Sequence, residues 1–243
     1  MDNYDLMFCD TCVGGSTVAA RLAAVRRGLQ AALERWVRLT VPRARTLVVA
    51  CNTASVLWRS CPAVQQLAQT SGLHVASMVD FLERLLQADP SPVAGRRVCL
   101  MGTRFTVAQP VYSDLLMQAG AREVVRLDAT RTEGVIARLQ HLTESGRREI
   151  AAEIGGTVRA CDVVVLACTL FPLVAGLIRE VNPSCALLDP GSGVADILPS
   201  SSGGNGENRL TVALTGAVLT PAALAQNAAA LFPGWQIDGL VSL

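Results

Sequence analysis

The sequence predicts an α/β fold of two similar three-layer halves with mostly parallel sheets, related by an approximate two-fold axis. Two short apolar runs, Leu47–Ala50 and Val163–Ala167, each lead directly into a cysteine, a polar turn and a helix start. Such runs are typical of buried parallel strands. Each half also contains an earlier strand followed by a glycine-bearing turn, at Asp10–Gly15 and at Gly102–Thr106. This repeated order predicts a ligand site in the cleft between the halves.

The composition favours a compact globular protein. The chain has 243 residues, of which 51% are hydrophobic, enough for a sizeable core. With 21 basic and 20 acidic residues, the net charge is +1, which indicates neither nucleic acid nor an anionic membrane as a partner. The segment Met1–Asp5 lacks the features of a signal peptide, and no apolar run reaches transmembrane length. The expected location is the cytoplasm.

Lysine and cysteine usage limits the cofactors. The sequence has no lysine, so the chain cannot form the Schiff base that pyridoxal phosphate requires. Its eight cysteines are predicted to be reduced thiols. Cys9 and Cys12 have the spacing of a redox or metal pair, but no second pair accompanies them, so no metal is expected. Cys99, Cys161 and Cys185 lie in or beside apolar segments and are predicted to be core residues.

Hydrophobic periodicity and capping signals predict the elements of the first half. They are a strand over Asp5–Cys9, a helix from Ser16 or Thr17 to before Pro42, a helix from the Cys51 turn to about Ser60, a short element before Gly72, a strand over His74–Met78 and a helix over Val79–Ala88. The proline cluster at Asp89–Pro92 is the predicted domain crossing.

The same signals predict the elements after the crossing. They are a strand over Arg97–Met101, one helix from the Gly102 turn through Leu116, a strand over Val124–Leu127, helices over Glu133–Leu142 and Arg148–Arg159, a helix after Cys168, a short helix over Val194–Leu198, a flexible loop over Pro199–Asn208, a strand over Leu210–Leu214, a helix from Thr220 to Leu231 and a closing segment over Trp235–Val241. Residues 1–92 with 200–243 are predicted to form one domain, and residues 93–199 the other.

Cys51 and Cys168 are the candidate chemical groups. A buried filler is the simplest interpretation of one cysteine, but two cysteines in matching strand-to-helix turns favour a chemical role. A thiol at a helix N-terminus has a lowered pKa, and the N–H groups there suit a carboxylate or an enolate. Two thiols that face one carbon from opposite sides can invert it, because one removes a proton and the other returns one.

Four motifs resemble the cofactor-independent aspartate/glutamate racemases, most closely the glutamate racemases. They are Asp10–Gly15, Ala50–Ser55, Gly102-Thr103 with Thr106, and Cys168–Leu173. The resemblance implies an active site between the halves, no cofactor, a small amino acid or related carboxylate as ligand, and a homodimer. It also implies site roles, which are Cys51 and Cys168 as the catalytic pair, Asp10 as an assisting group, and Thr11, Asn52, Thr53, Thr103, Thr106 and Thr169 as substrate-binding residues. Thr103 and Thr106 also suit helix capping.

The chain departs from this pattern at two places. Leu170 stands where glutamate racemases carry histidine, and the family's Pro-Tyr-Gly loop has no counterpart between Gly15 and Thr46, where a single helix fills the span. Leu170 is therefore the predicted specificity residue, for a substrate other than, or broader than, glutamate. Three glutamates are candidates for an acidic group that assists Cys168. Their spacing predicts exposed helix positions, and they are Glu133, Glu149 and Glu153.

Two alternatives stand beside the racemase interpretation. The first is a cysteine-dependent decarboxylase or isomerase of a small carboxylic acid with the same architecture. Retention of both thiols counts against a decarboxylase, since protonation of an enolate from one side needs only one. The second is a non-catalytic binding protein, which would be expected to lose a thiol sooner than to keep both.

Overall fold

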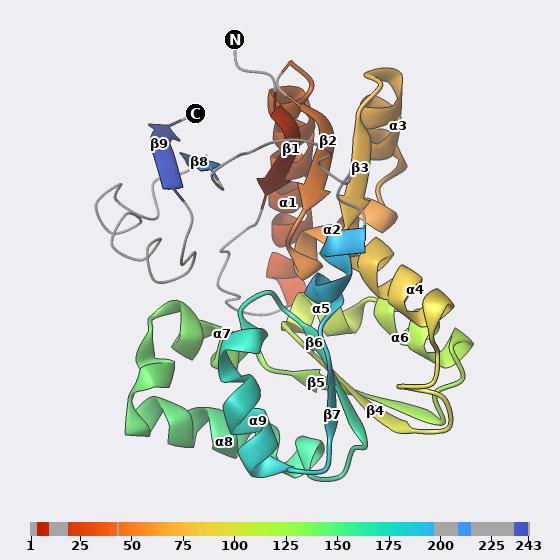
Figure 1. Cartoon of the computed structure of the whole chain (residues 1–243), viewed down its shortest axis with the longest axis vertical. Helices are drawn as coiled ribbons and strands as arrows, with labels where there is room; N and C mark the ends of the chain where they lie inside the picture. Colours follow the sequence, from red (N-terminus) through yellow and green to blue (C-terminus); the bar gives the residue numbers. More distant parts are fainter. Residues whose placement is uncertain (1–3, 10–18, 43, 197–208, 215–235, 243) are drawn as a thin grey trace. The chain divides into compact units, whose positions relative to one another are not determined.

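The computed structural model describes residues 4–9, 19–42, 44–196, 209–214 and 236–242 (Figure 1). Residues 1–197 form one compact unit and residues 198–243 form a second. All strand pairs within the three sheets are parallel. The predicted α/β fold with mostly parallel sheets is confirmed, whereas the approximate two-fold relation between halves stays a prediction.

The first sheet has the strand order β1-β2-β3. Its strands are β1 (Tyr4–Cys9), β2 (Ala44–Val49) and β3 (His74–Ser77). Four helices accompany it, and they are α1 (Ala19–Thr40), α2 (Asn52–Arg59), α3 (Pro62–Thr70) and α4 (Met78–Ala88). These elements follow the predicted order, and α1 is the single helix expected between the first two strands.

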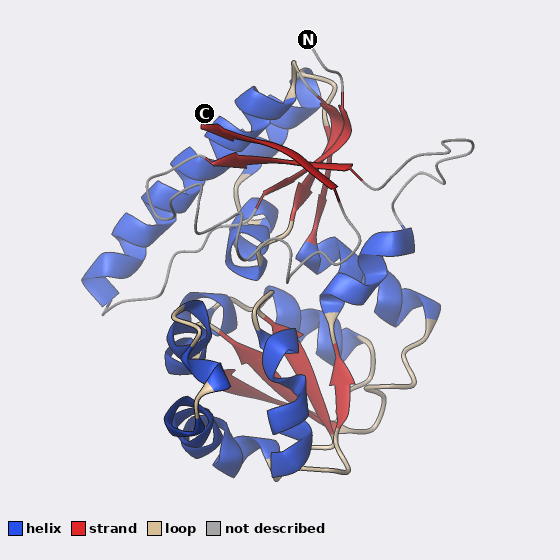
Figure 2. Cartoon of the chain, turned by 60° about the vertical axis from the view of Figure 1, so that its left-hand side comes forward, coloured by secondary structure: helices blue, strands red, loops and turns tan. Residues whose placement is uncertain are grey.

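The second sheet has the strand order β5-β4-β6-β7. Figure 2 shows strands in red and the helices around them in blue. Its strands are β4 (Arg97–Gly102), β5 (Glu123–Asp128), β6 (Val163–Ala167) and β7 (Ala186–Leu188). The helical segments around it are α5 (Arg104–Ala108), α6 (Val111–Gln118), α7 (Thr130–Ala137), η1 (Gln140–Leu142), α8 (Glu144–Val158), η2 (Phe171–Val174), α9 (Ala175–Val181) and η3 (Pro190–Asp196), where η marks a 3-10 helix.

Strand β4 is buried on both faces, which explains its continuous apolar sequence. Val98 and Leu100 belong to a core shared with α1 to α4 and β2. The alternating residues Cys99 and Met101 belong to a second core with α7, α8 and α9. Cys161 and Cys185 join this second core, so the prediction that these three cysteines are core residues is confirmed.

The structure corrects three helix predictions. One helix through Leu116 is wrong: Pro110 separates α5 from α6, because proline lacks the N–H that would continue the helix. The helix predicted over Glu133–Leu142 is divided between α7 and η1 by Leu139, whose φ of 59° is left-handed. The segment after Cys168 begins as the 3-10 helix η2 and becomes α-helical only at Ala175.

The end of the first unit returns toward α4. Segment η3 packs against this helix, where a Cβ added at Gly193 would lie 3.2 Å from the Phe81 carbonyl oxygen. The helical segment thus begins at Pro190, earlier than the predicted Val194, while 197–208 lie outside the described residues. The assignment of 200–243 to the domain of 1–92 stays a prediction.

The second unit contains the parallel pair of β8 (Arg209–Leu214) and β9 (Gln236–Ser242). The register shifts once, between Leu210 and Thr211. The strand expected over Leu210–Leu214 is confirmed, and the closing segment is a strand. The helix predicted from Thr220 to Leu231 lies outside the described residues.

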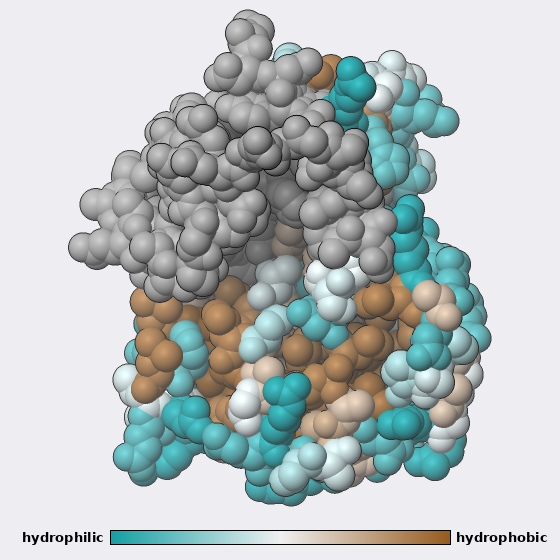
Figure 3. All heavy atoms as spheres, viewed as in Figure 1, coloured by the Kyte–Doolittle hydropathy of each residue, from teal (hydrophilic) through white to brown (hydrophobic). Residues whose placement is uncertain are grey.

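Apolar side chains also reach the surface. Figure 3 shows apolar residues in brown beside polar ones on the described part of one face. The exposed large apolar residues of the described ranges include Val41, Met117, Leu139, Leu142 and Leu173. In the part of the chain that the structure describes, no helix combines the length and apolar character needed to cross a membrane.

The homodimer stays a prediction.

Two glycines of α8 give a matched stability test. A Cβ at Gly146 would lie 2.0 Å from the Gln140 carbonyl oxygen, so η1 must move. Gly146→Ala is expected to lower the free energy of unfolding by about 1–3 kcal/mol, as overpacking does. Gly156 has open space around its Cβ position, so Gly156→Ala should raise stability by roughly 0.5–1 kcal/mol. Urea unfolding of both variants checks this; equal stabilities would contradict it.

Candidate active site

Cys51 lies at the N-terminal end of α2. Strand β2 is buried at Leu47, Val48 and Val49 and delivers Cys51 in an extended conformation as the N-cap residue. The thiol is 5% exposed and accepts a hydrogen bond from the Ala54 backbone N–H at 3.4 Å. The predicted strand–Cys–helix unit is therefore present. An N–H donor and the positive end of the helix dipole both stabilise negative charge on this sulfur.

Ser55 holds the Cys51 turn in place. Its buried hydroxyl lies 2.7 Å from the Cys51 carbonyl oxygen and 3.1 Å from the Val49 carbonyl oxygen. The same oxygen accepts a hydrogen bond from the Met78 backbone N–H at 3.1 Å. Because Met78 begins α4, this one side chain ties the end of β2 to the neighbouring β3–α4 junction. The backbone that carries the thiol is thereby fixed on both sides.

Cys168 follows β6 in a different local structure. All five residues of β6 are buried, whereas Cys168, Thr169 and Leu170 are half-buried. The Phe171 N–H donates to the Cys168 carbonyl oxygen at 3.0 Å, which starts η2 instead of an α-helix. Cys168 and Leu170 pack against the second core. The two strand-to-helix turns therefore match only in part, because Cys51 caps an α-helix whereas a 3-10 helix follows Cys168.

Three threonine hydroxyls join the first half to the second. Thr53 Oγ1 on α2 lies 3.1 Å from Thr103 Oγ1 and 3.0 Å from Thr106 Oγ1, and the latter two are 3.1 Å apart. Thr103 makes no side-chain capping bond to α5. Capping therefore does not explain its hydroxyl. The structure brings together three residues that the resemblance implies as substrate-binding. Thr53 precedes the proline cluster in the sequence, whereas Thr103 and Thr106 follow it.

The pairing of β4 with β6 brings the turn after β4 beside the turn that contains Cys168. Gly102 of β4 pairs with Ala167 of β6, so the turns that begin at Thr103 and Cys168 leave the sheet at the same level. Gly102 permits this close approach, because a Cβ there would lie 2.9 Å from Val107 Cγ1 and 3.4 Å from the Ala167 carbonyl oxygen. Both thiol turns therefore adjoin the turn at Thr103, at the strand edge where open α/β sheets bind ligands.

Asn52, the residue after Cys51, has a buried side-chain N–H group without a described hydrogen-bond partner. Its side chain is 2% exposed, and its Oδ1 accepts a hydrogen bond from the Tyr112 hydroxyl at 2.5 Å. Its Nδ2 is buried and has no hydrogen-bond partner among the described residues. In the sequence, Tyr112 stands out only as part of the predicted helix through Leu116. The spacing of 60 positions between the partners offers no signal for the contact.

The remaining predicted residues are placed less fully. Strand β1 ends at Cys9, which pairs with Val49 of β2, and Asp10 and Thr11 lie outside the described residues. Two of the glutamates that could assist Cys168 have other partners. Glu149 forms an ion pair with Arg131 at 3.9 Å, and Glu153 accepts hydrogen bonds from the Thr132 N–H and hydroxyl, each at 2.6 Å.

Glu133 differs from the surface position that its spacing predicts. It lies on α7 and is 5% exposed. No cluster of three or more His, Cys, Asp or Glu side chains suited to a metal ion occurs in the described ranges, and Cys12 of the Cys9–Cys12 pair lies outside them.

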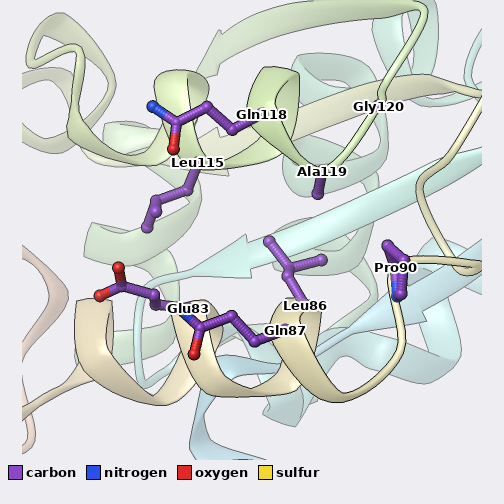
Figure 4. A pocket seen from close by; sticks show the side chains of 8 residues that line it. All are labelled: Glu83, Leu86, Gln87, Pro90, Leu115, Gln118, Ala119 and Gly120. Atoms are coloured by element: carbon purple, nitrogen blue, oxygen red, sulfur yellow. The ribbon is translucent and has the colours of Figure 1, made fainter.

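A separate pocket of about 380 Å³ lies between α4 and α6. Figure 4 shows Leu86 from α4 and Leu115 from α6 pointing toward one another across it. The other lining residues are Glu83, Gln87, Pro90, Gln118, Ala119 and Gly120. None of the predicted site residues lines this pocket, so it is distinct from the threonine and thiol region.

Comparison with known proteins identifies the family. The model of the Asp/Glu/Hydantoin racemase family matches residues 3–195. The chain belongs to this family. A glutamate racemase of Herpetosiphon aurantiacus is 29% identical over 185 residues, covering 75% of this chain and 66% of that protein. One of Sphingopyxis alaskensis is 34% identical over 164 residues, covering 62% and 56%. The chain thus spans about half to two-thirds of the curated relatives it matches.

Solved glutamate racemases share the fold. The structure of isoform RacE1 from Bacillus anthracis has a TM-score of 0.72 at 17% identity, with 98% of this chain and 97% of that one covered. The Francisella tularensis enzyme in complex with D-glutamate has a TM-score of 0.70 at 18% identity, with 99% and 88% covered. This agreement supports the α/β architecture of the Asp/Glu/Hydantoin racemase family for the chain.

Proposed function

We propose that the chain is a cofactor-independent amino-acid racemase or epimerase that inverts the α-carbon by proton transfer between Cys51 and Cys168. One observation carries the proposal: Thr53, two residues after Cys51, contacts Thr103, whose turn is in register with the turn of Cys168. This arrangement supports one polar site bordered by both thiols at the carboxyl ends of β2, β4 and β6. Family membership supports the same assignment.

In the proposed reaction, one cysteine thiolate removes the α-proton and the opposite thiol donates its own proton to the other face. The proton count is conserved, and the two cysteines exchange roles with the handedness of the substrate. The electron pair left on the α-carbon is delocalised into the substrate carboxylate. Hydrogen-bond donors around that carboxylate lower the barrier, because they meet the charge that develops in the transition state.

The resemblance to the aspartate/glutamate racemases implies the binding roles. We assign the substrate carboxylate and α-amino groups to Thr11, Asn52, Thr53 and Thr169, with Thr103 and Thr106 as supporting hydroxyls. The buried Nδ2 of Asn52 supports this role, because it has no described partner and a ligand would satisfy it. Asp10 is assigned to assist a thiol or to meet the substrate ammonium group.

Glu133 is the acidic residue that best fits the second half. It is buried on α7, whereas Glu149 and Glu153 hold Arg131 and the first turn of α7. Buried titratable side chains are typical of sites that transfer protons. We propose that Glu133 supports proton transfer at Cys168.

The inequivalence of the two thiols favours a second candidate function. Cys51 is the N-cap residue of α2 and accepts a backbone N–H, whereas the N-cap residue of η2 is Leu170 and not Cys168. A cysteine-dependent decarboxylase or isomerase of a small carboxylic acid needs one such thiol. A panel of single-enantiomer amino acids followed by polarimetry, beside a carbon dioxide assay on malonates, separates the two functions. Loss of optical rotation supports the racemase, carbon dioxide release supports the decarboxylase, and neither change rejects both of these reactions.

The activity is expected to depend on thiols and not on metal or pyridoxal phosphate. Iodoacetamide should abolish it as the site cysteines are alkylated, because the thiolate is the reactive form. Dialysis against EDTA should leave the initial rate unchanged, and added pyridoxal phosphate should not raise it. Loss of activity in EDTA that zinc restores would contradict the proposal and favour a metal site at Cys9 and Cys12.

A further inference from the structure

Tyr112 belongs to the second half of the chain and contacts Asn52 of the candidate site. It lies just after Pro110, where α5 and α6 are separated. Pro110 ends the run of α5 and starts α6, and Tyr112 is the second residue of α6. Its side chain is fully buried, with 0% exposure. A buried phenol normally finds a hydrogen-bond partner. The partner here is Asn52, which directly follows Cys51 and belongs to the other half of the chain.

The contact favours one orientation of the Asn52 amide, because Oδ1 is the described acceptor for the buried phenol proton. An amide has an acceptor oxygen and a donor nitrogen that differ only by a rotation of the group. A phenol that donates at 2.5 Å holds Oδ1 on its side and leaves Nδ2 on the other. Without the phenol, no described contact of Asn52 distinguishes the two orientations.

Tyr112 remains a donor under ordinary conditions. Burial raises the pKa of Tyr112 well above its usual value, and negative charge at Cys51, Asp80 and Cys168 raises it further, whereas Arg59 opposes this effect. The hydroxyl therefore keeps its proton.

We propose that Tyr112 is a positioning residue, which holds Asn52 Oδ1 so that Asn52 Nδ2 donates to the carboxylate of an amino-acid substrate beside Cys51. The inference rests on the proposed function and adds a residue outside the predicted site. The hydrogen bond also makes the correct orientation of Asn52 depend on the second half, because Tyr112 lies on α6.

A double-mutant cycle tests this role. Tyr112→Phe keeps the buried ring and removes only the hydroxyl. It is expected to lower kcat/KM by about tenfold, the size of one net hydrogen bond. Asn52→Ala should lower it further, and the double variant should equal Asn52→Ala within about twofold, because Tyr112 acts through Asn52. Independent, multiplying effects would overturn the inference.

Ser113→Ala is the matched control on the same helix. Its hydroxyl contacts the Pro110 carbonyl oxygen and Arg126 but not Asn52. This variant should keep kcat/KM within about twofold of the unmodified protein. Equal losses in Tyr112→Phe and Ser113→Ala would show a general effect of α6 packing and overturn the positioning role.

A second readout needs no turnover. The side-chain amide signals of Asn52 in ¹⁵N–¹H NMR spectra are assigned by their absence in Asn52→Ala. Tyr112→Phe should shift and broaden these signals, and Ser113→Ala should not. Unchanged signals in Tyr112→Phe overturn the inference whatever the activity. Changed signals in a protein without racemisation or α-hydrogen exchange would reject the proposed function while the orientation of Asn52 by Tyr112 stands.

Discussion

Cys51→Ala and Cys168→Ala are each expected to slow racemisation by roughly 10²–10⁴-fold in both directions, the usual contribution of a general acid or base. Both directions slow because each turnover uses both thiols. The two variants should differ in what remains. The surviving thiol still reaches the α-proton of one enantiomer and exchanges it with solvent without inverting the carbon.

Isotope exchange in deuterated water separates the two variants. Mass spectrometry or proton NMR should find deuterium entering one enantiomer in Cys51→Ala and the opposite enantiomer in Cys168→Ala. In the unmodified enzyme, early product should carry deuterium at the α-carbon. The same enantiomer preference in both variants, or near-normal racemisation after loss of either cysteine, would contradict the two-base mechanism and favour a reaction with one thiol.

Cys61→Ala is the matched control for these variants. Cys61 is also buried and is the N-cap residue of α3, but its side chain makes no capping hydrogen bond. Removing it deletes a thiol at the start of a helix without touching the proposed site. Racemisation and exchange should stay within about twofold of the unmodified protein, since a cysteine in this setting is a small apolar core residue.

The strands were predictable because their signals are local. Leu47–Ala50 and Val163–Ala167 are continuous apolar runs, and burial of β2 and β6 on both faces accounts for such runs. The cysteines that follow β2 and β6 were found in the same way. Pro110 marks the break in the sequence because it lacks an N–H, whereas the helical spacing of apolar residues continues through Leu116.

The contacts within the site were not predictable from local patterns. Thr53 and Thr103 are 50 positions apart, and their contact depends on the packing of α2 against α5. Capping and substrate binding both fit Thr103 in the sequence, and only the absence of a side-chain capping bond separates them. Likewise the spacing of Glu133 fits an exposed helix face, whereas α7 buries it within the fold. Such features follow from tertiary packing.

Leu170→His is expected to change the ratio of kcat/KM between the native substrate and glutamate by about a hundredfold. Leu170 is half-buried against the second core, two residues after Cys168. We propose that its free face meets an apolar part of the substrate, an interaction worth roughly 1.5–3 kcal/mol. Histidine removes that contact and supplies a polar group beside the thiol. The native substrate should therefore lose activity and glutamate should gain it.

Leu173→His tests whether the position, and not the added histidine, causes this change. Leu173 lies in the same segment, η2, but is 49% exposed, so it is not expected to contact the substrate. Steady-state kinetics on both substrates should show an unchanged ratio in Leu173→His and a shifted ratio in Leu170→His. Two results would contradict a specificity role for Leu170. If glutamate is already the best substrate of the unmodified protein, the apolar contact is unnecessary for substrate selection. If both variants shift the ratio equally, the added histidine and not the position causes the change.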